Sequence, residues 1–178
     1  VTKLWNSFRL VLMQIGEEGF SFNSHSVTPG NAAQEWIISR LGKVIGEHDR
    51  LLEESDFPRA FDVLTSYFWN EFCDWYLELS KPAFRVGSEE GRKALEVAMH
   101  CQCALLKLFH PYVPFVTEEL WQLLQKLHVR DEASAGTEQG CLAKAHWPKV
   151  EAFPVNESSE SALGLLTSTV RAVRELRH

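Results

Sequence analysis

The stretch from Tyr67 to Pro82, YFWNEFCDWYLELSKP, constrains the fold of this chain more than any other. When it is wound as an α-helix together with the residues before it, side chains three and four positions apart return to the same face. This spacing aligns one row of apolar side chains: Phe61, Leu64, Phe68, Phe72, Trp75 and Leu79. The opposite side is almost as apolar, and such a helix normally packs on several sides. We therefore expect a central helix with a bundle built around it.

The other helices are predicted from the same periodicity and from residues that cap helix ends. Thr28 before Pro29, Asp56 and Ser88 are of the types that favour a helix start, and Pro82 and Pro111 are of the type that ends one. The predicted helices run over about residues 2–15, 28–52, 56–81 and 88–109, then from Pro114 or Thr117 to about 127, and from 161 onward. The predicted fold class is all-α, a helical bundle of about five to six helices.

The length of 178 residues suits one buried core, or a core with a small appendage. We expect a helical bundle over residues 1–127. Residues 128–160 are richer in Ala, Gly, Ser, Pro and Glu and read as a connector packed on the bundle, pinned by Trp147 and Pro148. Residues 161–178 form a last helix that is predicted to lead toward an absent region.

The composition excludes several classes of protein. No apolar run approaches the length of a membrane-spanning helix, and the net charge of −6 argues against a polybasic nucleic-acid arm. An acidic chain can still bind a folded RNA if stacking and hydrogen bonds contribute most of the affinity. The start at Val1 without a secretory leader predicts a fragment of a longer protein. The four cysteines lack a disulfide pattern, so we expect a reducing, cytoplasmic location.

The sequence offers no visible active site and no metal centre. Cys101 and Cys103 lie near His100 and His110, but positions two apart on a helix diverge by about 200°, so both thiols cannot reach one ion. Glu118 and its neighbour stand at a helix start, where the helix dipole accounts for them. The phosphate-binding, dinucleotide-binding, metalloprotease and serine-hydrolase motifs are all missing from the chain. We predict no catalytic residue and no metal ligand.

Four segments in order closely resemble the anticodon-binding helical domain of valyl-tRNA synthetases. They are KLWNSFRLVL at residues 3–12, WIISRL at 36–41, YFWNEFCDWYLELSKP at 67–82 and HPYVPFVTEELW at 110–121. The closing RAVRELR resembles the segment that follows that domain. The HPYVPFVTEELW segment is shared with the isoleucyl, leucyl and methionyl relatives, whereas EFCDWYLELSKP is more typical of the valyl enzymes.

The resemblance implies a piece of an enzyme and a role in tRNA recognition. In that family the domain follows a catalytic domain with HIGH-type and KMSKS-type signatures, which are absent here. The parent would be a valine–tRNA ligase that uses ATP and Mg, whereas this fragment would hold no cofactor and would be inactive alone. The implied partners are the anticodon stem-loop of valine tRNA and the parent's catalytic domain, with no DNA and no membrane.

The resemblance also implies which residues read the tRNA, on the first helix, the loop after it and the second helix. Asn6 offers an amide suited to an adenine edge, and Arg9 can serve a phosphate or a base acceptor. The remaining candidates are three aromatic residues for stacking and two cations, namely Phe20, Phe22, Trp36, Arg40 and Lys43. Each has a structural alternative: a cap or interhelix bond for Asn6, a surface ion pair for Arg9, packing on the core for the two phenylalanines, and a solvated flank for the second helix.

Three functional interpretations remain open at this point. The first is the anticodon-binding domain of a valyl-tRNA synthetase, and the second is the equivalent domain of an isoleucyl or leucyl enzyme. The third is a helical protein-interaction module without RNA binding, which the acidic charge would suit.

Overall fold

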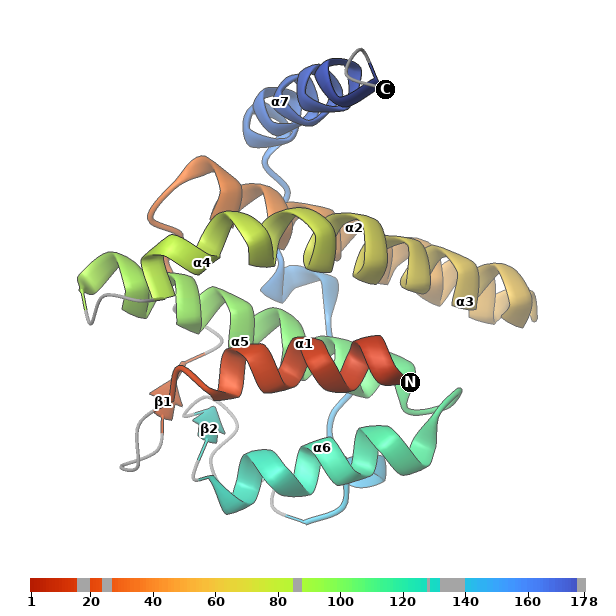
Figure 1. Ribbon diagram of the computed structural model, residues 1–178. Helices are drawn as coiled ribbons and strands as arrows, with labels where there is room; N and C mark the ends of the chain where they lie inside the picture. The colour runs from red at the N-terminus through yellow and green to blue at the C-terminus, as the bar shows by residue number, and fades with distance from the viewer. Residues whose placement is uncertain (16–19, 24–26, 85–87, 128, 132–139, 176–178) are drawn as a thin grey trace.

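The computed structural model describes residues 1–15, 20–23, 27–84, 88–127, 129–131 and 140–175, and it is almost entirely helical (Figure 1). The helices are α1 (Thr2–Leu12), α2 (Ala32–Glu53), α3 (Phe57–Ser66), η1 (Tyr67–Leu77), α4 (Glu78–Phe84), α5 (Glu89–Phe109), α6 (Pro114–Lys126) and α7 (Glu157–Glu175). Two single turns of 3₁₀-helix, η3 (Leu142–Lys144) and η4 (Val150–Ala152), lie in the connector. The predicted all-α class is confirmed.

The helices pack in layers around one core. The rod formed by α3, η1 and α4 lies alongside α2, α5 crosses below this pair, and α1 and α6 lie on the far side of α5 (Figure 1). The α7 helix packs on α2 at the opposite edge of the molecule. One feature was not predicted: β1 (Phe20–Phe22) pairs in parallel with β2 (Val129–Asp131), which joins the segment after α1 to the segment after α6.

The predicted start of the second helix is wrong by three residues. The N-cap is Asn31 rather than Thr28, because the Asn31 side chain accepts a hydrogen bond from the Gln34 backbone N–H at 3.0 Å. The Gln34 side chain in turn accepts from the Gly30 backbone N–H at 2.6 Å, so two otherwise unsatisfied donors are served reciprocally. The predicted caps Asp56 and Ser88 are confirmed, each accepting from the backbone three residues on.

The central helix is present but differs in pitch from the prediction. Its middle, η1, is a π-helix, whose hydrogen bonds reach one residue further than those of an α-helix. The wider turn shifts the buried face, so Tyr76 and Leu77 are buried whereas Leu79, which α-helical spacing placed in the core, is 43% exposed. The predicted stop at Pro82 is also wrong, because α4 continues through it to Phe84.

Two buried phenols tie η1 to its neighbours. The Tyr67 hydroxyl donates to the Ile37 carbonyl of α2 at 3.0 Å, and the Tyr76 hydroxyl donates to the Ala94 carbonyl of α5 at 3.0 Å. Both side chains are buried, so these bonds satisfy polar groups that would otherwise be costly to bury. The stretch that dominates the sequence therefore lies at the centre of the fold.

The connector lies against α2, and α7 follows it. Trp147 donates from its indole N–H to Asp49 at 2.9 Å, and Phe153 is buried. The last helix starts earlier than the predicted residue 161, because Asn156 accepts a hydrogen bond from the Ser159 backbone N–H at 3.1 Å. The predicted connector start at 128 and chain end at 178 lie outside the described residues.

Candidate nucleic-acid interface

The outer face of α1 carries the polar residues that the sequence placed there. Leu4, Phe8 and Val11 are buried against the core, which turns the opposite side of the helix to solvent. That side, which we call the outer face of α1, is exposed at four positions: Thr2, Asn6, Arg9 and Met13. In the part of the chain that the structure describes, no hydrogen bond or ion pair engages the Asn6 amide or the Arg9 guanidinium.

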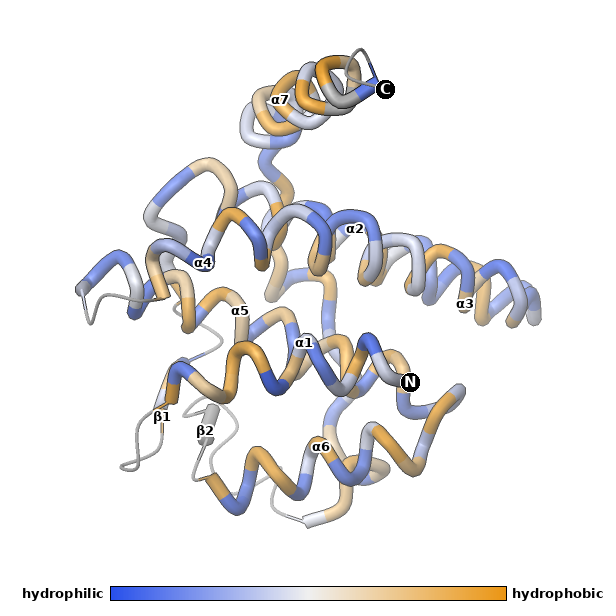
Figure 2. The backbone as a smooth tube through the Cα atoms, in the orientation of Figure 1, coloured by the Kyte–Doolittle hydropathy of each residue, from blue (hydrophilic) through white to orange (hydrophobic). Residues whose placement is uncertain are grey.

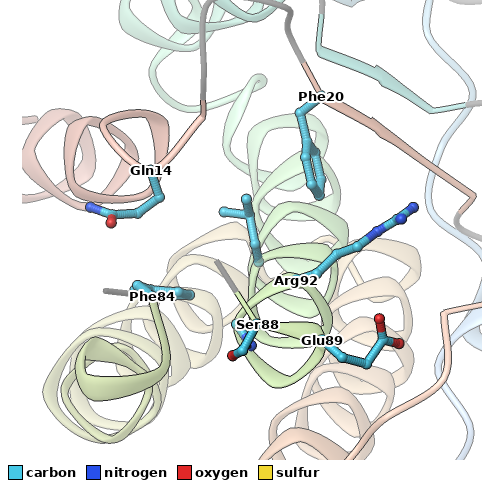
Figure 3. Close-up of a pocket in the computed structure, with 8 residues that line it drawn as sticks. Gln14, Phe20, Phe84, Ser88, Glu89 and Arg92 are labelled. Atoms are coloured by element: carbon cyan, nitrogen blue, oxygen red, sulfur yellow. The ribbon is translucent and has the colours of Figure 1, made fainter. Parts of the chain in front are cut away.

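A cavity of about 280 Å³ lies next to the C-terminal end of α1 (Figure 3). We call it the aromatic pocket, because two phenylalanine rings, Phe20 from β1 and Phe84 from the end of α4, approach it from different sides. Its full lining is Gln14, Phe20, Phe84, Ser88, Glu89, Gly91, Arg92 and Leu95. Its wall therefore combines flat apolar surface, an amide and the capped start of α5.

The charged groups at this pocket are partly balanced. Arg92 donates to Glu96 at 3.0 Å on the surface of α5, and Ser88 accepts from the Gly91 backbone N–H at 3.2 Å. The Gln14 amide donates to the Leu10 carbonyl at 3.2 Å, which leaves its oxygen as an acceptor. The pocket is suited to a planar polar ligand more than to a highly charged one.

The predicted stacking residues divide between exposed and buried positions. Phe20 is half-buried and lines the aromatic pocket, whereas Phe22 is only 3% exposed and lies in the core. Their rings stack with centroids 6.2 Å apart. Trp36 is 6% exposed on the buried side of α2. The interpretation of Phe22 and Trp36 as stacking surfaces disagrees with this burial, because alternate strand residues and inward helix residues face the protein.

The two predicted cations of α2 are engaged within the protein. Arg40 donates two hydrogen bonds to Glu71 of η1 at 2.7 and 2.9 Å, and Lys43 donates to Glu160 of α7 at 2.8 Å. The Glu71 hydrogen bond raises the pKa of Arg40. Burial tends to raise the pKa of Glu160, but hydrogen bonds from Lys43 and Ser39 outweigh it, so that pKa is lowered. These cations join helices and do not form a free basic surface.

The described residues offer no alternative reactive centre. No group of three or more histidine, cysteine, aspartate or glutamate side chains among them could hold a metal ion. Burial raises the pKa of both Cys73 and Cys101 to about 12, so these thiols remain protonated and poorly nucleophilic near neutral pH. None of the described helices has the length and apolar character needed to cross a membrane. The polar face of α1 and the aromatic pocket are therefore the strongest candidate site.

Sequence reasoning missed two contributors to this site. Phe84 was overlooked because the helix was expected to end before it, at Lys81, whereas α4 extends through Pro82. Gln14 was overlooked because only the α1 residues opposite the buried row were considered. Local sequence rules end a helix at a proline, so placing Phe84 at the pocket required the observed end of α4.

Comparisons with known proteins identify one matching family and several similar relatives. The family model for the anticodon-binding domain of tRNA ligase matches residues 34–178. The valine–tRNA ligase of Dehalococcoides mccartyi strain CBDB1 is 36% identical over 178 residues, and that of Thermotoga maritima is 35% identical over 175 residues. Each alignment covers 98% of this chain, but the chain spans only 19% and 18%, respectively, of these relatives' lengths.

Proposed function

The chain belongs to the family of anticodon-binding domains of tRNA ligases, and on that basis we propose that it binds the anticodon loop of valine tRNA. The surface would be the outer face of α1 together with the aromatic pocket. The observation that carries this proposal is the exposure of Asn6 and Arg9, without partners in the described chain, on the helix whose C-terminal end adjoins a cavity lined by two phenylalanines.

The chemistry of these groups suits unpaired RNA bases. Single-stranded bases are recognised by hydrogen bonds to their edges and by stacking on aromatic rings. Asn6 presents both a donor and an acceptor, Arg9 presents a fork of donors, and Phe20 and Phe84 present ring surfaces. With a net charge of −6, the chain would rely on these contacts more than on phosphate neutralisation. Its RNA affinity should therefore depend only weakly on salt.

The activity of the parent protein is part of the same proposal. The names of the relatives support attachment of valine to its tRNA. We propose in addition that ATP and Mg act in a catalytic domain outside this chain. This chain would contribute tRNA recognition, hold no cofactor itself and act in the cytoplasm beside that catalytic domain. It contains neither the HIGH-type nor the KMSKS-type signature, so we expect it to be inactive alone.

Two other functions are distinguished by the choice of RNA. An isoleucyl-type or leucyl-type domain would prefer isoleucine or leucine tRNA, although the relatives named above are all valine–tRNA ligases. A protein-interaction module would bind none of the three. Fluorescence anisotropy at low salt with each tRNA, and with valine tRNA carrying a changed anticodon, separates these cases.

Variants of this chain locate the surface in the same assay. Arg9→Met removes the exposed guanidinium of α1, and Phe84→Ala removes one wall of the aromatic pocket. Arg59→Met is the matched control, because Arg59 is a 65% exposed surface arginine on α3. We expect the first two to weaken binding to valine tRNA and the control to leave it unchanged. Equal affinity for native and anticodon-changed tRNA, with cooperative unfolding retained, would overturn the proposal.

A further inference from the structure

A second concave surface lies on the other side of α1 from the aromatic pocket. It is a groove of about 460 Å³ between α1 and α6, which lie side by side in Figure 1. We call it the α1–α6 groove, and its lining shares no residue with the aromatic pocket. It is lined by Trp5, Arg9, Leu12, Met13, Leu120, Leu123 and Leu127. Figure 2 shows that both helices carry hydrophobic residues along their length.

The groove is apolar but carries unpaired positive charge. Its lining contains one charged residue, Arg9, and no carboxylate. Lys126, next to Leu127 at the end of α6, is exposed and also has no partner among the described residues. Elsewhere in the described chain most cations are paired with carboxylates, for example Lys3 with Asp74 at 2.8 Å. In a chain of net charge −6, an unpaired arginine in the lining and an unpaired lysine next in sequence to a lining residue favour an anionic ligand with an apolar part.

A nucleotide has this combination of properties. Trp5 is 37% exposed and Met13 is 69% exposed, so the groove offers an indole ring and a polarisable thioether to a planar base. Arg9 lines the same groove and can bind a phosphate with two donors. We propose that the α1–α6 groove holds one unpaired nucleotide of the bound RNA, its base against Trp5 and its phosphate on Arg9.

This inference rests on the proposed function, since it adds a second nucleotide site for the same RNA. The two sites would lie on either side of α1, so that the RNA loop straddles the helix. A partner protein helix is the alternative occupant of an apolar groove. The lack of any carboxylate in the lining and the two unpaired cations favour RNA.

The test uses the whole chain and a set of valine-tRNA anticodon stem-loops, each with one loop base removed to leave an abasic sugar. Trp5→Ala should weaken binding of the intact stem-loop about tenfold, as expected for loss of one stacked base. Trp5→Phe should recover most of that affinity. One abasic RNA should bind about as weakly as the intact RNA does to Trp5→Ala, and Trp5→Ala should have no further effect on that RNA.

Two control variants test whether the loss of affinity is specific to this groove. Trp69→Ala removes an indole of similar exposure, 43%, on η1, whose ring lies under the Lys3 ammonium and does not line the groove, and it should change affinity less than about twofold. Phe84→Ala should also weaken binding of the intact RNA, but its effect should disappear for an RNA that is abasic at a different position, because Phe84 lines the aromatic pocket. Urea unfolding of each variant confirms that the fold is retained.

The outcomes distinguish this inference from the function on which it rests. If Trp5→Ala weakens binding no more than Trp69→Ala does, the groove does not hold a nucleotide, even when Phe84→Ala still reduces affinity. If Trp5→Ala weakens every abasic RNA equally, no single base lies on Trp5 and the inference is wrong. If Trp5 couples to one loop position but native and anticodon-changed tRNA bind with equal affinity, the groove site is supported and anticodon recognition is wrong.

Discussion

The outer face of α1 and the flank of α2, by which we mean Trp36, Arg40 and Lys43, are similar in sequence but have different roles in the structure. Both carry arginine near a tryptophan on an amphipathic helix, and both were predicted to contact tRNA. On α1, Arg9 is exposed and has no partner among the described residues. On α2, Arg40 is held by Glu71 from η1 and lies 3.8 Å from Glu160 of α7.

The difference shows that acceptors from other helices decide whether a cation is available to a ligand. Glu71 lies 31 residues from Arg40 and Glu160 lies 117 residues from Lys43, so no local pattern reveals either pair. The α2 flank is where η1 and α7 attach, and its charges stabilise that attachment. The α1 face is covered by no described helix, and its charge remains available for binding.

Gly42→Ala should produce the largest effect, because Gly42 lies where the connector meets α2. A Cβ at this position would overlap the backbone oxygen of Phe153, which is not the end of a flexible side chain. We expect the free energy of unfolding to fall by about 2–3 kcal/mol in urea titrations. Gly46→Ala is the matched control: its Cβ would meet only Val150, at 3.8 Å, and alanine should stabilise the helix by about 0.5–1 kcal/mol. Equal effects would mean that the connector does not dock on α2 here.

Arg40→Met should come next and should affect stability but not binding. It leaves the Glu71 side chain, 22% exposed, without its two hydrogen bonds. Because the pair is only partly buried, we expect a loss of about 1–2 kcal/mol in urea unfolding, below the value for a fully buried pair. Arg59→Met, at a 65% exposed arginine, should change stability by less than about 0.5 kcal/mol. A large loss of RNA affinity in Arg40→Met would contradict a purely internal role.

Arg9→Met should affect RNA binding but not stability, which is the reverse of the result expected for Arg40→Met. No described group depends on the Arg9 guanidinium, so stability should change by less than about 0.5 kcal/mol. Affinity for valine tRNA should fall by about 1 kcal/mol, roughly fivefold, and the slope of affinity against salt should fall by about one if the contact is a phosphate. Anisotropy titrations at several salt concentrations measure both quantities. Unchanged affinity would place the RNA on another surface.

Much of the bundle could be predicted from the sequence because helix periodicity and helix capping depend on residues close together in the chain. Helix periodicity placed Leu64, Phe68 and Phe72 in the core, and all are buried. The caps Asp56 and Ser88 were predicted because a side-chain acceptor next to its own helix needs no tertiary partner. The α6 helix starts at Pro114, one of the two predicted positions.

The errors arose where distant segments decide the outcome. Local spacing cannot reveal the π-helical turn of η1, which moves Leu79 out to solvent. Nor can it reveal the parallel pairing of β1 with β2, which accompanies the burial of Phe22. For the candidate site, the exposure of Asn6 and Arg9 was predicted correctly, whereas the second wall of the aromatic pocket required the observed end of α4. Their contact with RNA remains a prediction.

Mild acid should have the smallest effect, and it should act on the contacts of α2 and not on the outer face of α1. His48 of α2 is buried, stacks on Trp147 of the connector with centroids 5.8 Å apart, and pairs with the Tyr112 hydroxyl at 3.1 Å. Burial lowers the pKa of His48 from its usual 6.5, although Asp49 acts in the opposite direction. The unfolded chain therefore binds a proton more readily than the folded chain, and the free energy of unfolding should fall as the pH drops below about 6.5.

Urea midpoints at about pH 7.5 and pH 5.5 measure this effect within a window in which the lowered pKa of Glu160 keeps that carboxylate ionised. His48→Gln keeps a hydrogen-bonding group near Tyr112 but removes the titration, so the part of the pH dependence due to His48 should disappear. The outer face of α1 contains no histidine, so RNA affinity measured on the folded chain should change much less than stability. If the free energy of RNA binding fell by more than the free energy of unfolding, the α2 flank and its connector would support the RNA surface. The conclusion that α2 serves stability and α1 serves binding would then be wrong.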